Sequence, residues 1–234
     1  MIVIVGIDGL EYDYVKEFGF PNLMQKNYGT TDLSEFEKPR TMVIWSSFLS
    51  GKNQEERILA EKEMWKFRLS TDETFFSKFG KHIAIDVPGY TQDMEQHAKE
   101  RQAMKDFFDK KIKIEDYDKM VFAHHNKIKE KFFESLEHDY DIVMGYFNAA
   151  DVIGHLSFGV KPKMKVIYKE MDDIVGKALE KADTLLVISD HGMEAVGRYG
   201  DHSDHGFWSF NKEGLKPEKP SPMEFYGLLG NNER

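Results

Sequence analysis

The sequence predicts an α/β fold with a mainly parallel central sheet and helices on both of its faces. Four short apolar runs lie along the 234 residues, at Ile2–Ile7, His82–Asp86, Ile142–Phe147 and Thr184–Ser189. They show little alternation of apolar and polar side chains, which is typical of parallel strands that helices cover on both sides. Longer segments with helical periodicity separate these runs, and this order of elements favours an α/β protein.

The helices are placed by the spacing of their apolar residues. The clearest pattern runs over Lys163–Lys181, where apolar residues recur at spacings of four, three and four and Pro162 stands in the first turn. Near the C-terminus, the short apolar segment Met223–Leu229 predicts a docked helix. We expect the last residues, 231–234, to be frayed.

The composition is that of a globular protein and narrows its chemistry. Hydrophobic residues make up 41% of the chain, and 41 Asp and Glu stand against 32 Lys and Arg, which gives a formal charge of −9. This charge repels phosphate-rich partners on average, so we expect no stable binding to nucleic acid and none to membranes. The chain has no Cys, which excludes disulfides, zinc–thiolate sites and a cysteine nucleophile, and fits a reducing compartment.

We expect a single cytoplasmic domain over 1–234. No segment approaches the roughly 20 apolar residues that cross a bilayer. The N-terminal apolar run has no basic leader and ends at Asp8, so no signal peptide is expected. A helical insert at about 91–140 is either a small lid or a set of helices packed on one sheet face. The absence of a Gly/Ser/Pro-rich linker favours the second option. The oligomeric state is left open.

Asp and His residues follow three of the four predicted strands. Ligands of open parallel sheets bind beyond the carboxyl ends of the strands, so these residues are expected to meet at one sheet edge. They are Asp8 after the first strand, Asp151 and His155 after the third, and Asp190 and His191 after the fourth, with His202 and His205 in a later glycine-flanked segment. Each alone has an ordinary role as a cap or a surface residue. Their common placement after core strands indicates a site.

Asp and His without Cys are ligands for Zn²⁺ or Mn²⁺. Six or seven of them exceed what one tetrahedral ion takes, so we expect two divalent ions. Two metals on such ligands are a common apparatus of phosphoryl-ester hydrolysis. Bound metal also removes the repulsion among Asp8, Asp151 and Asp190, which would otherwise raise one another's pKa.

A candidate nucleophile is Thr41, which begins a helical apolar pattern that stops at Gly51. Thr is a favoured helix N-cap, and that is its ordinary role. A hydroxyl at a helix N-terminus also faces unpaired N–H groups and the positive end of the helix dipole, which suits a phosphate. Since a metal ion could ionise this hydroxyl, Thr41 is also a candidate nucleophile.

Seven segments, in order along the whole chain, resemble the alkaline phosphatase superfamily, specifically its type I phosphodiesterase/nucleotide pyrophosphatase branch. They read VIVGIDGL, TMVIWSSFLSG, TFFSKFGKHIAIDVPGY, YFNAADVIGH, LLVISDHGM, GDHSDHGFW and SPMEFYGLLG. The Asp-His-Gly in LLVISDHGM is the most specific of them. The resemblance implies an alkaline phosphatase-like three-layer sandwich and a phosphate-ester hydrolase. It also implies a binuclear metal centre, most often zinc and in some relatives manganese.

The resemblance implies a role for each candidate residue. One metal would be held by Asp151, His155 and His202, and the other by Asp8, Asp190 and His191, with Thr41 as the nucleophile that forms a phospho-threonine intermediate. His202 is preferred to His205 because the family's His stands four residues before a Gly that an aromatic strand follows, as Gly206 does here. His205 is the alternative ligand or a substrate contact.

The chain departs from the nucleotide-cleaving members of the family after the nucleophile. Those members place Pro, Asn and His soon after it, where this chain has Val43, Ile44 and Trp45. We therefore expect a phosphodiesterase acting on a small phosphate ester, for which a nucleotide is one option. The alternatives are a phosphomonoesterase or phosphotransferase with the same residues, and a non-catalytic homologue that binds metal or a partner.

Other residues near the motifs have less specific roles. The candidate substrate contacts are His205, Trp45, Tyr90 and Asn148, with core packing as the simpler expectation for Trp45. A phosphomonoesterase would need a cation, for which the nearest candidates in sequence are Arg40, Lys52 and Arg198, each with a surface position as the simpler expectation. The pair His124-His125 is expected at the surface, because adjacent residues on a helix point apart.

Overall fold

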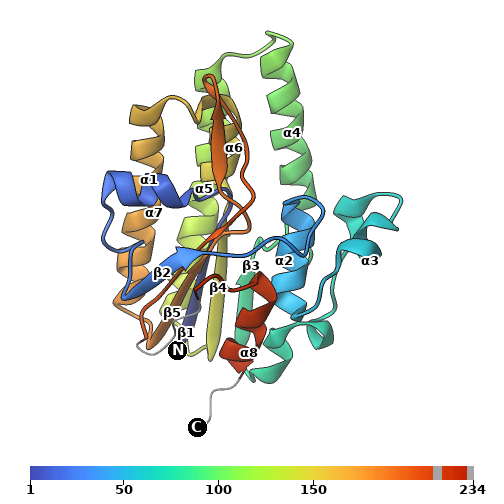
Figure 1. The fold of residues 1–234 in the computed structure, drawn as a ribbon, viewed down its shortest axis with the longest axis vertical. Helices are drawn as coiled ribbons and strands as arrows, with labels where there is room; N and C mark the ends of the chain where they lie inside the picture. Colours follow the sequence, from blue (N-terminus) through green and yellow to red (C-terminus); the bar gives the residue numbers. More distant parts are fainter. Residues whose placement is uncertain (213–217, 231–234) are drawn as a thin grey trace.

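The computed structural model describes residues 1–212 and 218–230, which form a six-stranded sheet between two layers of helices (Figure 1). The strands lie in the order β2-β8-β5-β1-β4-β3. Their bounds are Ile2–Ile7 (β1), Asn27–Thr30 (β2), His82–Ile85 (β3), Ile142–Phe147 (β4), Thr184–Ile188 (β5) and Phe207–Phe210 (β8). A separate hairpin consists of β6 (Met193–Val196) and β7 (Tyr199–His202). The predicted α/β class is confirmed, and the expectation for 231–234 lies outside the described residues.

The centre of the sheet is parallel and buried on both faces. β1 pairs in parallel with β4 on one side and β5 on the other, and β3 continues the parallel arrangement beyond β4. All residues of β1 and β4 are buried, which is why their sequences show no alternation. Alternate residues of β1 enter two hydrophobic clusters, one on each face, with Val3 and Val5 in the first and Ile4 in the second.

Helices cover both faces (Figure 1). The first face carries α1 (Tyr12–Phe18), α5 (Ile114–Leu136), α6 (Ala149–Ser157) and α7 (Lys161–Leu179), and the second carries α2 (Thr41–Ser50), α3 (Glu55–Leu59) and α8 (Phe225–Gly230). Short 3-10 turns lie at Met64–Lys66, Thr71–Glu73, Phe75–Lys78 and Pro222–Glu224. The predicted helices near Lys163–Lys181 and Met223–Leu229 are confirmed, and α8 packs on α2. None of the helices in the described ranges has the length and apolarity that a membrane span requires.

The segment 91–140 contributes two helices with different surroundings. α5 packs on β4, β3 and α6, as expected for a helix that covers a sheet face. α4 (Met94–Phe108) packs on α5 and stands away from the sheet (Figure 1). Only α5 therefore matches the prediction of helices packed on the sheet.

The antiparallel part of the sheet was not predicted. β8 pairs antiparallel with both β5 and β2. β2 reads Asn-Tyr-Gly-Thr and is only half-buried, so it gives no apolar run in the sequence. β3 ends at Ile85, one residue before the predicted limit, because Asp86 turns the chain with a φ of 61°.

The prediction that His124 and His125 lie at the surface is wrong. His125 is 1% exposed and lies against Phe147 of β4, and its Nε2 is 3.2 Å from Glu170 of α7. The His124 side chain is 10% exposed and lies 2.9 Å from Glu100 of α4. The two imidazoles do point apart, but α5 has another element on each side, so both are covered.

Candidate metal centre and substrate pocket

Three neighbouring strands deliver acidic residues to one edge of the sheet. The order β5-β1-β4 places Asp8, just after β1, between Asp190, which follows β5, and Asp151, in the first turn of α6 after β4. The Asp8 N–H donates to the carbonyl of Phe147, which keeps the ends of β1 and β4 together. The β6–β7 hairpin then brings His202 to the same edge. The cluster therefore lies beyond the carboxyl ends of the parallel strands, as predicted.

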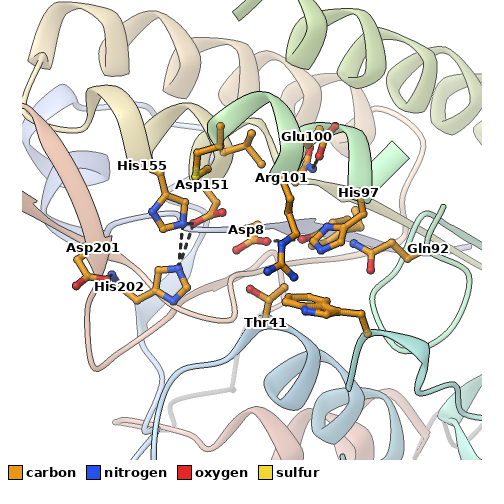
Figure 2. A pocket seen from close by; sticks show the side chains of 15 residues that line it. Asp8, Thr41, Gln92, His97, Glu100, Arg101, Asp151, His155, Asp201 and His202 are labelled. Atoms are coloured by element: carbon orange, nitrogen blue, oxygen red, sulfur yellow. Dashed lines mark hydrogen bonds and ion pairs between the residues drawn. The ribbon is translucent and has the colours of Figure 1, made fainter. Parts of the chain in front are cut away.

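Asp151, His155 and His202 form one group that could hold a metal ion. His155 and His202 face each other with their Nε2 atoms 3.2 Å apart (Figure 2). The Asp151 Oδ1 lies 3.3 Å from the His155 Nε2 and 3.5 Å from the His202 Nε2. A tetrahedral Zn²⁺ with bonds of about 2.0–2.1 Å holds its ligand atoms about 3.3 Å apart. The three atoms therefore have the spacing of zinc ligands.

Asp8, Asp190 and His191 form a second group. The His191 Nε2 lies 3.2 Å from the Asp8 Oδ1 and 3.3 Å from the Asp190 Oδ2. The His191 ring stacks on that of His202 with centroids 3.6 Å apart, so the two groups are adjacent. All three residues of this group are buried, with exposures of 3% or less.

Buried carboxylate oxygens in both groups lack a hydrogen-bond partner among the described residues, although three of them lie near a His Nε2. The oxygens that lack such a partner are the Oδ1 of Asp8, the Oδ1 of Asp151 and both carboxylate oxygens of Asp190. A buried, unpaired carboxylate is strongly disfavoured unless a cation or a proton compensates it. The donor set of Asp and His, without Cys, suits Zn²⁺ or Mn²⁺. Both groups therefore fit a divalent metal ion.

The three imidazoles are oriented by backbone carbonyls. The Nδ1 of His155 lies 3.3 Å from the Gly200 carbonyl, that of His191 lies 3.0 Å from its neighbour Gly192, and that of His202 lies 2.9 Å from Pro39. A ring that donates from Nδ1 to a carbonyl presents a lone pair on Nε2. In all three, Nε2 points into the cluster, as a metal ligand requires.

The protonation of the cluster reflects crowding of like charges. Burial, reinforced by Asp190 and Asp151, raises the pKa of Asp8 well above its ordinary value. Burial and the charge of Asp151 raise the pKa of Asp190 to about 7. Burial disfavours the charged form of His202, but its attraction to Asp151 outweighs this and raises its pKa to about 10. Without metal, the cluster therefore favours the protonated forms of Asp8, Asp190 and His202.

Thr41 stands beside the second group and is not a helix cap. The N-cap of α2 is Arg40, and Thr41 is the first helical residue. Its Oγ1 lies 3.5 Å from the His191 Nε2. The first N–H groups of a helix lack intrahelical partners, so α2 presents donors and the positive end of its dipole here. The hydroxyl is free of the capping role and available for chemistry.

A pocket of about 370 Å³ opens onto these residues (Figure 2). Its floor includes Asp8, Thr41 and the Asp151 group. Its opposite wall comes from α4, through His97, Glu100, Arg101 and Met104, with Trp65 beside them. The segment 91–140 therefore supplies one wall of the pocket, which its sequence did not indicate.

His205 pairs with Glu11 outside both ligand groups. The His205 Nε2 lies 3.3 Å from the Glu11 Oε1, and this carboxylate also accepts hydrogen bonds from the N–H groups of Asp13 and Met193. These contacts anchor the segment that carries His202. His205 belongs to neither ligand group and does not line the pocket.

Of the two roles considered for Trp45, the structure supports core packing and not a substrate contact. Trp45 is 1% exposed and packs edge-on against Tyr146 and Phe48 in the core. A Cβ on Gly6 would lie 2.7 Å from the Trp45 ring, so β1 has a glycine where this ring crosses it. Tyr90 is likewise not a pocket residue, since it stacks on Phe76 and its hydroxyl lies 2.8 Å from that of Thr71.

Asn148 does line the pocket, and a buried polar chain holds it. Its Nδ2 donates to the Glu100 Oε2 at 2.8 Å. The other oxygen of Glu100 lies 2.9 Å from the His124 Nδ1, and the His124 Nε2 lies 3.4 Å from Asp86. Burial is the main cause that raises the pKa of Asp86 to about 6. This row of polar side chains connects α4, α5 and the end of β3 to the turn that leads into α6.

Of the pocket residues that were missed in the sequence, Tyr146 and Arg101 matter most for the chemistry. The Tyr146 hydroxyl donates to the Asp8 Oδ2, which leaves the Asp8 Oδ1 directed at the ligand group. Tyr146 lies within a predicted strand next to that of Asp8, so its position was the only available signal. Arg101 lies in a charged helix with no strand end near it, and nothing in the sequence marked it. Arg40, by contrast, pairs with Glu55 at 2.9 Å.

A mainly parallel sheet whose carboxyl edge carries two Asp/His groups suits a hydrolase of phosphate esters. Comparison with known families agrees, because the model for type I phosphodiesterase / nucleotide pyrophosphatase matches residues 2–209. The chain belongs to this family, which is a family of phosphoric ester hydrolases.

Individual relatives are distant or much longer. GPI ethanolamine phosphate transferase 2 of Yarrowia lipolytica is 28% identical over 151 residues, which are 62% of this chain and 16% of that protein. The solved structure of an inactive variant of murine ectonucleotide pyrophosphatase/phosphodiesterase 5 with AMP has a TM-score of 0.51 and 13% identity. The human counterpart has a TM-score of 0.44 and 17% identity. This chain spans 58% of each of these two chains, and 84% of it is covered.

Proposed function

We propose that this chain hydrolyses phosphate esters, with phosphodiesters ahead of monoesters, by means of Thr41 and two divalent ions, zinc before manganese. The observation that carries the proposal is the pair of three-ligand groups, with buried carboxylate oxygens that lack a hydrogen-bond donor, beside the Thr41 hydroxyl. Buried carboxylate oxygens without a donor are expected where a cation binds. The family supports the reaction class.

Asp151, His155 and His202 would hold one ion, and Asp8, Asp190 and His191 the other. Divalent ions at such positions lower the pKa of a nearby hydroxyl and stabilise the charge that develops on phosphoryl oxygens. Tyr146 keeps Asp8 in place through its hydrogen bond. The backbone carbonyls at Gly200, Gly192 and Pro39 keep the imidazoles turned inward.

Thr41 is the proposed nucleophile. Its Oγ1 forms a bond to phosphorus while the bond from phosphorus to the leaving alcohol breaks, which gives a phospho-threonine and frees the alcohol. Water then attacks the phosphorus, and Thr41 is regenerated. The N-terminus of α2 faces the phosphoryl oxygens in both steps with its N–H groups. The murine relative solved with AMP is an inactive variant with alanine in place of a threonine, which supports both a threonine nucleophile and a nucleotide-type substrate.

Phosphotransfer is the second candidate, because the Yarrowia lipolytica relative is named as a phosphate transferase. The same phospho-threonine would then pass its phosphoryl group to an alcohol instead of water. Adding an alcohol acceptor, such as ethanolamine, to the assay separates the two. A phosphorylated acceptor formed in place of free phosphate product would identify a transferase.

The test of the function is hydrolysis of a bis-aryl and a mono-aryl phosphate by metal-free protein titrated with zinc and with manganese. We expect turnover to appear with metal and to saturate near two ions per chain, with the diester faster. A matched control is the same titration of an Asp151→Asn variant. A protein that takes up two ions and turns over neither ester would contradict the catalytic proposal and favour a binding role.

A further inference from the structure

One cation faces the proposed active site from the wall opposite the ligand groups. Arg101 is the only lysine or arginine among the described residues that line the pocket. It extends from α4 toward the side of the pocket that holds Thr41 (Figure 2). Arg101 is itself exposed, so its charge is not required for the packing of α4.

The guanidinium is held in place by an aromatic ring. Its central carbon lies 5.0 Å from the centroid of Trp65, which also borders the pocket. His97, one helical turn earlier, packs on the same indole with ring centroids 4.4 Å apart. Stacking on an indole orients a guanidinium while its N–H groups stay free to bind an anion in its own plane.

No carboxylate in the described part of the chain neutralises this charge. The adjacent Glu100 is the obvious partner, but its oxygens are engaged by Asn148 at 2.8 Å, His124 at 2.9 Å and Gln96 at 3.0 Å. Asp201, on the hairpin across the pocket, accepts a hydrogen bond from the backbone N–H of His202 at 2.9 Å. The donors of Arg101 are therefore left for a ligand.

We propose that Arg101 is the anion-binding, specificity-determining residue of this pocket, selecting phosphate esters that carry a second negative charge. This inference rests on the proposed function. A guanidinium binds two phosphate oxygens at once, so it favours a substrate with an additional phosphate charge over a diester with a single charge. In keeping with the diester preference proposed above, the second charge is assigned to a further phosphate in the leaving group of a diphosphate ester. A monoester, whose transferred phosphoryl group itself carries the second charge, is the other source of the same chemistry, and the test distinguishes the two.

The test compares Arg101→Ala and Arg101→Lys with a control, Lys99→Ala, which removes the same charge from α4 outside the pocket. The substrates are a mono-aryl phosphate, a bis-aryl phosphate and a nucleotide-type diphosphate ester. For at least one doubly charged substrate we expect Arg101→Ala to lower kcat/KM about tenfold or more, with less than about threefold loss on the bis-aryl ester. Lys should restore part of the loss, and the control should behave as the parent protein. The substrate that suffers the larger loss identifies the source of the second charge.

A second measurement keeps this inference separate from the proposed function. Inorganic phosphate is titrated calorimetrically into the parent protein and the same variants, each loaded with stoichiometric metal. We expect Arg101→Ala to weaken the affinity about tenfold and Lys99→Ala to leave it unchanged. If the parent protein turns over no ester, the proposed function fails, and the phosphate titration alone decides the role of Arg101. Equal affinity for phosphate in Arg101→Ala and the parent protein, or equal losses on all three substrates, would overturn the inference.

Discussion

Removing the charge of Asp190 should have opposite effects on the metal-free and the metal-loaded protein. Asp190 is 1% exposed, and its two oxygens have no hydrogen-bond partner among the described residues. In metal-free protein at pH 8 this carboxylate is a buried charge without a hydrogen-bond donor. We predict that Asp190→Asn stabilises the metal-free protein and lowers both metal affinity and the stability of the metal-loaded protein.

The magnitude follows from the pKa. Burial, reinforced by the charge of Asp151, raises the pKa of Asp190 from 3.8 to about 7. Because the folded state holds this proton more tightly than the unfolded state, the metal-free protein loses stability as the pH rises from about 4 to about 7. At about 1.4 kcal/mol per pH unit, the loss is on the order of 4 kcal/mol. Asp190→Asn should therefore raise the free energy of unfolding by up to about 4 kcal/mol at pH 8 and by little at pH 4.

The assay is urea unfolding followed by tryptophan fluorescence at pH 4 and pH 8, with chelator and with zinc. The matched control is Asp173→Asn, on the exposed side of α7. It should change the free energy of unfolding by no more than about 0.5 kcal/mol under any of these conditions. If Asp190→Asn destabilised the metal-free protein at pH 8 as much as the zinc-loaded protein, the account of Asp190 as a destabilising buried carboxylate that a metal ion neutralises would be wrong.

Four other substitutions test the support of the site. Gly9 has a φ of 69°, and a Cβ in Gly9→Ala would lie 2.8 Å from the Asp151 backbone. The affinity for zinc, measured by calorimetry, should therefore fall at least about tenfold. An unchanged affinity would show that the turn at Gly9 can adjust to the added methyl group. His202→Ala should lose one zinc ion per chain by metal analysis, whereas His205→Ala should retain both, and the reverse result would exchange their roles. His124→Ala leaves two buried carboxylates without their partner and should lower the free energy of unfolding by about 3 kcal/mol. Burial lowers the pKa of His124, but its hydrogen bond to Glu100 outweighs burial, and the pKa is raised. The loss of stability in His124→Ala should therefore be full below about pH 6.5 and shrink as the pH rises through the folded pKa of His124. A loss of stability that grows with pH would contradict this prediction.

The sequence revealed the part of the site that depends on the sheet. Strands buried on both faces give apolar runs, and a polar residue directly after such a run stands at the carboxyl edge of the sheet. Asp8, Asp190 and His191 could therefore be placed by position alone. His202 required the family pattern, because the β6–β7 hairpin that carries it is largely exposed and polar.

The sequence did not reveal contacts that depend on how helices pack against each other. The side chains of α4 have little apolar periodicity, so neither its place over the pocket nor the direction of Arg101 could be derived. His124 and His125 were misplaced for a related reason. A helix covered on two sides buries adjacent residues in opposite directions, and only the positions of α4 and α7 show this.

The most direct test of the central claim is detection of the covalent phosphate on Thr41. Zinc-loaded protein is mixed with a bis-aryl phosphate, quenched in acid within one turnover, and analysed by peptide mass spectrometry beside a Thr41→Ala variant of equal metal content. We predict an aryl-phosphoryl adduct on Thr41 in the parent protein, since one aryl alcohol leaves and the other stays on phosphorus, and no adduct and no turnover in the variant. Turnover that persists in Thr41→Ala would contradict the account, because the phosphoryl group would then pass to water or to another residue.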